Sequence, residues 1–326
     1  MEKIVGRDGT EVTTYEFPYM RRADKRTNWE KFRQGCYNPD EGSFLGRQPS
    51  AWARVSLFYL VFYTVLASLF TICMYVMLST IDKEYPKWQL DESIIGTNPG
   101  LGFRPIADKT EEGSLIWFDA KNASEVAKWT MRIDEFLAPY KNRSRLPSHG
   151  ENQMFCDYQK GPNTANRVCA VNMDLWGVCT SQENYGFGKS APCVFLKLNR
   201  IYNWIPDYYD DVTALPSDMP MELKTHIKML KPDERKQIWV SCQGENPVDR
   251  ENLGPVEMYP GMGFAGYYYP FRNQKDYLSP LVAVQFKRPE VGRLINVECR
   301  AWAKNIIYRG GNKDRQGSVH FELMVD

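Results

Sequence analysis

The feature that most constrains this chain is a run of 27 residues, 55–81, that contains no Asp, Glu, Lys or Arg. As a helix rising ~1.5 Å per residue, this run would extend about 40 Å, which exceeds the ~30 Å hydrocarbon core of a bilayer. It begins too far from Met1 for a cleaved signal peptide, and no second run of this kind follows. We therefore expect a transmembrane signal-anchor helix at 55–81, between an N-terminal segment, 1–54, and a large domain, 82–326.

The placement of the cysteines indicates which side of the membrane holds the large domain. An even set beyond the span is typical of a disulfide framework in an oxidising compartment. Two glycosylation sequons, at Asn122 and Asn142, lie on the same side, and the N-terminal segment has none. We therefore expect a single-pass type II protein with a cytoplasmic N-terminus and an extracellular C-terminus. Six of the eight cysteines lie beyond the span: Cys156, Cys169, Cys179, Cys193, Cys242 and Cys299.

Hydrophobic periodicity predicts the architecture of the large domain. Apolar residues recur at helical spacing over 123–140, and Asn122 followed by Glu125 has the spacing of a capping box. Short runs of strand-like residues follow, separated by Gly, Pro and Asn, and they indicate a β-sandwich. Cys242 and Cys299 have the inward phase of two of these strands, so a bridge between them is sterically sensible. The runs lie at 238–242, 281–286, 295–301 and 319–325.

Composition excludes some functions and leaves two motifs to weigh. The net charge of +1, without a basic stripe, gives no sign of a nucleic-acid partner. The glycines of 261–266 have dinucleotide-fingerprint spacing, but Pro270 blocks the helix that this motif needs, so we interpret the match as accidental. The acidic turn 207–211 could ligate a hard cation, as in a metal-dependent glycosyltransferase, although a solvated turn is the simpler interpretation. We expect no catalytic residue, cofactor or metal.

The interior of the span is more specific than an anchor requires. Phe58 and Phe62 are four residues apart, as are Tyr59 and Tyr63, so each pair lies on one helix face. Lipid contact needs only apolar side chains, whereas a tyrosine hydroxyl deep in a membrane favours a protein partner. The alternative is an aromatic belt at the interface, which suits Tyr59 better than the deeper Tyr63.

Several motifs in order resemble the β-subunit family of the Na+/K+- and H+/K+-transporting P-type ATPases. The resemblance covers nearly the whole chain beyond its variable N-terminus, and the six cysteines complete it. It implies an immunoglobulin-like β-sandwich with a helical insertion and long loops, and sequential disulfides Cys156–Cys169, Cys179–Cys193 and Cys242–Cys299, although the sequence alone allows 15 pairings. The motifs are residues 29–32, 44–47, Trp52, 58–67, 268–270 and 277–286.

The resemblance also implies a function and its contact residues. Family members are not enzymes: they assist the folding, plasma-membrane delivery and cation affinity of a catalytic α-subunit, which is the expected partner together with the lipid bilayer. Tyr59 and Tyr63 would pack on an outer transmembrane helix of that subunit. Tyr268, Tyr269 and Pro270 would face its extracellular loops, while Phe271 replaces a tyrosine of many relatives.

Three questions stay open at this level. No single residue distinguishes a Na+/K+ pump from a H+/K+ pump, although the general match favours Na+/K+. Whether a small regulatory membrane subunit also binds is not decided by the sequence. A cell-adhesion or junction glycoprotein that uses the extracellular domain for recognition is the alternative function.

Overall fold

The computed structural model describes residues 4–5, 11–12, 27–39, 42–108, 113–164, 166–311 and 314–326. It forms two compact units, Met1–Ile81 and Asp82–Asp326. Of the first 26 residues, which belong to the expected cytoplasmic segment, only the short strands β1 (Ile4–Val5) and β2 (Glu11–Val12) are described.

The first unit continues with a small motif that leads into a long helix. Helix α1 (Asn28–Cys36) starts after Thr27, which forms a capping box with Glu30. A two-stranded hairpin, β3 (Tyr37–Asn38) and β4 (Ser43–Phe44), follows. The indole Nε1 of Trp52 donates to the carbonyl of Phe44 at 2.7 Å, so the hairpin is joined to the first turns of the long helix.

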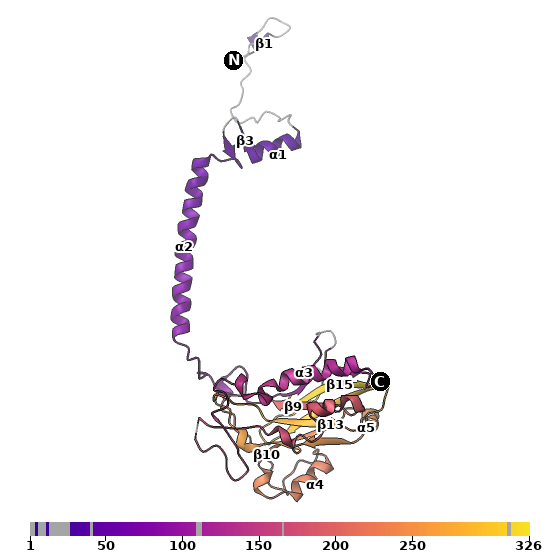
Figure 1. The fold of residues 1–326 in the computed structure, drawn as a ribbon. Helices are drawn as coiled ribbons and strands as arrows, with labels where there is room; N and C mark the ends of the chain where they lie inside the picture. The colour runs from indigo at the N-terminus through magenta and orange to yellow at the C-terminus, as the bar shows by residue number, and fades with distance from the viewer. Residues whose placement is uncertain are drawn as a thin grey trace. The chain divides into compact units, whose positions relative to one another are not determined.

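That long helix, α2 (Pro49–Ser79), runs without a break (Figure 1). It has 31 residues, and none of its side chains is buried. Among the described residues it is the one helix that is long and apolar enough to cross a membrane. It starts six residues before the charge-free run begins and ends two residues before that run ends. The bounds differ because Pro49, which favours the first helical turn, sets the start of the backbone helix, whereas the absence of charge sets the predicted span.

The second unit is built on two main sheets. A five-stranded sheet has the order β12-β10-β14-β15-β6, and a four-stranded sheet has the order β11-β13-β9-β5. Neighbours are antiparallel except β15 with β6, and a separate pair, β7 with β8, is also parallel. The strands are β5 (Leu101–Arg104), β6 (Leu115–Phe118), β7 (Gln153–Met154), β8 (Val168–Cys169), β9 (Cys193–Leu198), β10 (Gln237–Gly244), β11 (Val256–Tyr259), β12 (Gly263–Ala265), β13 (Leu281–Phe286), β14 (Leu294–Trp302) and β15 (Ser318–Val325).

The two sheets share one hydrophobic core. The ring of Phe321, on β15, lies 4.9 Å from that of Phe103 on β5 and 6.0 Å from that of Phe286 on β13. All three side chains are buried, so aromatic packing joins the sheets. The four strand runs read from the sequence lie within β10, β13, β14 and β15, which confirms a mainly-β domain beyond a single apolar helix.

The described part of this unit also contains three α-helices: α3 (Ala123–Lys141), α4 (Met221–Met229) and α5 (Pro247–Leu253). Helix α3 confirms the helix predicted at 123–140, and it lies on the opposite side of the sheets from α4 (Figure 1). The indole of Trp129 donates to the carbonyl of Trp117 at 2.9 Å. Because β6 is an edge strand, this bond satisfies a backbone group that would otherwise be open to another chain.

Candidate partner-binding site

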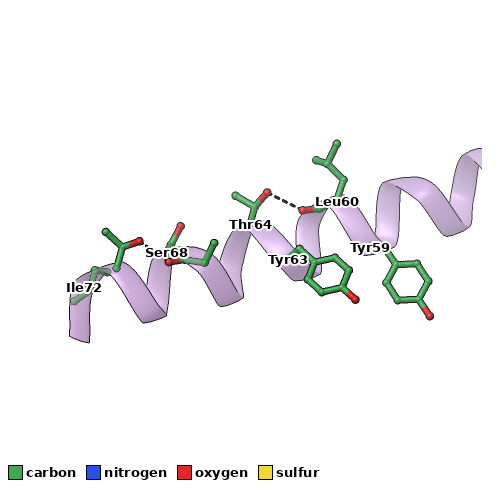
Figure 2. A pocket seen from close by; sticks show the side chains of 8 residues that line it. Tyr59, Leu60, Tyr63, Thr64, Ser68 and Ile72 are labelled. Atoms are coloured by element: carbon green, nitrogen blue, oxygen red, sulfur yellow. Dashed lines mark hydrogen bonds between the residues drawn. The ribbon is translucent and has the colours of Figure 1, made fainter. Parts of the chain in front are cut away.

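The aromatic face of α2 is the candidate contact surface of the first unit. The rings of Tyr59 and Tyr63 stack with centroids 5.9 Å apart, and those of Phe58 and Phe62 are 6.1 Å apart. Both tyrosines project from the same side of the helix, away from Thr64 (Figure 2). The i, i+4 spacing therefore places the rings as the sequence predicts.

The tyrosine face continues into a shallow, open concavity of smaller side chains. Thr64 and Thr71 donate their hydroxyls to the carbonyls one turn back, Leu60 and Ala67, at 2.7 Å each, so these groups are satisfied within the helix (Figure 2). The hydroxyls of Tyr59 and Tyr63 make no hydrogen bond to any described residue, and the side chains are 49% and 59% exposed. This face therefore offers ring surface and two unused hydroxyls. The concavity is lined by Tyr59, Leu60, Tyr63, Thr64, Ala67, Ser68, Thr71 and Ile72.

The Tyr268-Tyr269-Pro270 stretch is a separate candidate surface in the second unit, and much of it is turned inward. The hydroxyl of Tyr268 donates to the carbonyl of Ala170 at 3.2 Å, and the ring of Tyr269 packs edge-on against Trp204. Burial raises the pKa of both tyrosines well above their ordinary value, so both hydroxyls stay protonated. These two side chains shape the domain surface from within.

Tyr269 and Pro270 nevertheless line a small cavity. Its volume is about 230 Å³, and Arg167, Arg272 and Tyr277 also contribute to its wall. The Tyr269 hydroxyl is buried and has no hydrogen-bond partner in the described part of the chain. An unpaired buried hydroxyl is costly, which makes it the one group of this stretch that a bound partner or water would satisfy.

The two sequons lie at opposite ends of α3. Asn122 is the N-cap, and its side chain accepts a hydrogen bond from the backbone of Ser124. The reciprocal half of the expected capping box is missing, because Glu125 accepts from the backbone of Asp119 and from the Asn122 amide instead. Asn142 is the C-cap, and both asparagines are exposed. A glycan at either position would therefore project into solvent.

The structure contains three disulfides, Cys156–Cys169, Cys179–Cys193 and Cys242–Cys299, which is the pairing implied by the family resemblance. Cys242 and Cys299 are direct register partners on β10 and β14. Cys36 and Cys73 are free. The bridges thus belong to the second unit alone.

Comparison with known proteins decides the family. Residues 22–321 match the family described as the sodium/potassium ATPase beta chain. The chain belongs to this family.

The similarity to relatives in this family covers nearly the full length of both chains. The sodium/potassium-transporting ATPase subunit beta-2 of Drosophila melanogaster is 47% identical over 94% of this chain and 96% of its own. Subunit beta-1 of the same organism is 48% identical over 95% and 96%. The potassium-transporting ATPase subunit beta of Rattus norvegicus is 28% identical over 90% and 94%.

The glycines of 261–266 and the acidic turn 207–211, which could indicate another function, both lie in the second unit. Gly263 lies in β12, and only a three-residue 3₁₀ turn, Gly266–Tyr268, follows, so the helix that a dinucleotide fingerprint requires does not form. In the acidic turn, the ammonium of Lys304 lies 3.4 Å from Asp207 and 3.6 Å from Asp210. These carboxylates are therefore matched by a cation of the chain itself.

Sequence reasoning missed a larger cleft beside the Tyr-Tyr-Pro stretch. Tyr85 packs edge-on against Tyr202, and Asn273 donates its amide to the carbonyl of Glu84 at 3.1 Å. These contacts hold the first residues of the second unit against a loop almost 190 residues later in the chain. No local pattern predicts such a contact; the only signal is the aromatic character of Tyr85 in a polar segment.

Proposed function

We propose that this chain is the non-catalytic β-subunit of a Na+/K+-transporting P-type ATPase. It assembles with the catalytic α-subunit, assists its folding and delivery to the plasma membrane, and tunes its cation affinity. The two relatives near 48% identity carry the name of the sodium/potassium pump, and the potassium pump relative is more distant, which supports Na+/K+ as the transported pair.

The observation that carries this proposal is the exposed tyrosine face of α2. A helix that only anchors a domain needs no polar atoms, yet Tyr59 and Tyr63 present stacked rings and unused hydroxyls on one side. In a bilayer such groups are stabilised by a neighbouring helix that accepts their hydrogen bonds. We assign this face to a transmembrane helix of the α-subunit, and Tyr269 and Pro270 to contact with its extracellular loops.

We also propose a membrane orientation for the chain and a fold for its second unit. Residues 1–54 are cytoplasmic, 55–81 cross the plasma membrane, and 82–326 form an extracellular immunoglobulin-like sandwich carrying the glycans of Asn122 and Asn142. The confinement of all three disulfides to the second unit supports this sidedness, because such bridges persist in oxidising compartments.

Purification of the tagged chain from native membranes in mild detergent tests the assignment. A much larger ATPase chain should co-purify in near-equal amount, and mass spectrometry should identify it as a sodium-pump α-subunit. Recovery of the chain alone would refute the subunit assignment. Bead aggregation driven by the full chain without any pump would instead support the adhesion function, which the family membership does not favour.

A further inference from the structure

The larger cleft of the second unit has a composition that the subunit function does not explain. Its volume is about 830 Å³, within the ~300–1,000 Å³ typical of small-molecule sites. Glu84 and Tyr85, three and four residues beyond the end of the apolar run, form part of its wall. Since an extended chain covers at most ~3.6 Å per residue, this wall stays within about 15 Å of the end of the run. Only a short covalent link therefore separates this wall from the predicted span in the chain.

Unpaired cations line this cleft. Arg200, Arg272 and Lys275 make no ion pair with any described residue, and all three are exposed. Arg200 uses its Nε to donate to Ser279 at 2.9 Å, and Arg272 uses its Nε to donate to Asn203 at 3.0 Å. The outer guanidinium nitrogens stay available, and such groups are suited to phosphate oxygens.

Among the described residues, the buried carboxylate of the cleft, Asp276, forms no ion pair with these cations. Asp276 accepts hydrogen bonds from the backbone of Ser148 at 2.7 Å and from the backbone and side chain of Asn152 at 3.3 and 3.2 Å. Its oxygens therefore link two loop segments through these hydrogen bonds. The carboxylates that remain open to the cleft are those of Glu84 and Glu151.

Aromatic rings form a continuous row along the same wall. Tyr85 contacts Tyr202, Tyr202 contacts Phe271, and Phe271 contacts Tyr277, with centroids 6.4, 6.4 and 4.9 Å apart. The guanidinium of Arg200 lies over the last two rings, at 5.3 and 5.1 Å. Among the described residues no cation lies over Tyr85 or Tyr202. This open half of the row, beside Glu84, suits a quaternary ammonium group.

We propose that this cleft binds the phosphocholine headgroup of an outer-leaflet phospholipid. The phosphate lies against Arg200 and Arg272, with Lys275 nearby, and the choline lies against Tyr85 and Tyr202. A headgroup that joins an anionic phosphate to a quaternary ammonium matches a cleft that offers both unpaired guanidinium groups and open aromatic rings. This inference rests on the proposed topology: with residues 55–81 in the bilayer, the short link to Glu84 and Tyr85 supplies headgroups to the cleft at high local concentration.

Titration of the full chain, in maltoside micelles free of phosphate and choline, with glycerophosphocholine tests this proposal. Saturation-transfer NMR should give a dissociation constant at least tenfold lower for glycerophosphocholine than for choline or glycerol 3-phosphate. Arg272→Gln should weaken binding at least tenfold. Arg309→Gln is the matched control, because Arg309 is equally exposed but lies outside the cleft, and it should leave the affinity unchanged.

The choline end has its own pair of variants. Tyr85→Leu should weaken glycerophosphocholine binding about fivefold or more, while Tyr85→Phe, which keeps the ring, should retain it. Thermal unfolding of each variant checks that the domain is intact. Equal binding by wild type and Arg272→Gln, or equal affinity for glycerol 3-phosphate and glycerophosphocholine, would overturn the proposal.

A further outcome separates this inference from the subunit assignment. If Arg272→Gln lowers the amount of α chain that co-purifies and the wild-type chain shows no saturation transfer to glycerophosphocholine, the cleft is a protein-docking surface and the lipid proposal fails. The subunit assignment would survive that result, since it rests on co-purification with the wild-type chain.

Discussion

Helix α2 and the second unit differ in where their apolar side chains lie: those of α2 are on its surface, and those of the second unit are largely in a core. Not one side chain of α2 is buried, although almost all of its surface is apolar. The second unit instead encloses a core between two sheets and fastens it with three disulfides. The helix thus needs an apolar environment from outside the chain, whereas the second unit supplies its own. Substitutions in the two regions should therefore differ in what they damage.

The largest effect is expected at the disulfide between β10 and β14. Cys242→Ser should lower the free energy of unfolding of the second unit by about 4 kcal/mol, because this bridge closes a loop with a sequence separation of 57 residues. Urea unfolding of the purified chain measures the change, and cells should retain the variant in the endoplasmic reticulum.

The short-loop bridge provides the control for that measurement. Cys156→Ser opens a loop with a separation of only 13 residues, so the chain-entropy account predicts a loss smaller by about 1 kcal/mol. Equal losses for the two variants would show that loop length does not control their stabilities. Normal surface delivery of Cys242→Ser would show that the bridge is dispensable.

A smaller effect is expected where α3 covers the edge of the five-stranded sheet. Trp129→Phe removes the indole donor and leaves the Trp117 carbonyl unpaired, which should cost about 1–3 kcal/mol. Thermal unfolding measures it, with the exposed Trp88→Phe as the matched variant expected to stay within about 0.5 kcal/mol of wild type. Equal stability of the two variants would contradict the edge-covering role of α3.

Substitutions in the tyrosine face of α2 should weaken partner binding and not the stability of the second unit. Tyr59→Ala with Tyr63→Ala should leave unfolding of the second unit unchanged but weaken α association by about 1–2 kcal/mol, roughly tenfold. Co-purification in a detergent series measures the loss. Tyr75→Ala is the control, because at 100° per residue Tyr75 is 120–160° around the helix from this face. Undiminished co-purification of the double variant would remove these residues as contacts.

The smallest effect concerns pH. Burial lowers the pKa of His226, which packs edge-on against Trp239, below its ordinary value of 6.5. The unfolded chain therefore takes up a proton first as pH falls through 6.5, so stability is full above that pH and declines as pH falls through the folded-state pKa. Melting temperatures between pH 7.5 and 5.5 should show a small decline that His226→Gln abolishes. The exposed His149→Gln should keep it; the same slope in both variants would exclude His226 as the source.

The sequence by itself determined features that depend on local pattern or composition. The absence of charge over 55–81 marks a helix that is long and apolar enough to cross a membrane, and spacing alone places Tyr59 and Tyr63 on one face. The apolar period of 123–140, the alternation within β10, β14 and β15, and the near-continuous apolar run of β13 likewise gave the right elements. These features follow from helix and strand geometry, which fixes how near neighbours in the chain are oriented.

Only the tertiary structure determined which residues far apart in the sequence contact one another. The parallel pairing of β6 with β15, the inward turn of Tyr268 and Tyr269, and the cleft between Tyr85, Arg200 and Arg272 join segments far apart in the chain. Each depends on which strands become neighbours, and that choice is made by burial of the whole core. Periodicity shows which face of a strand is apolar; the shared core determines what that face meets.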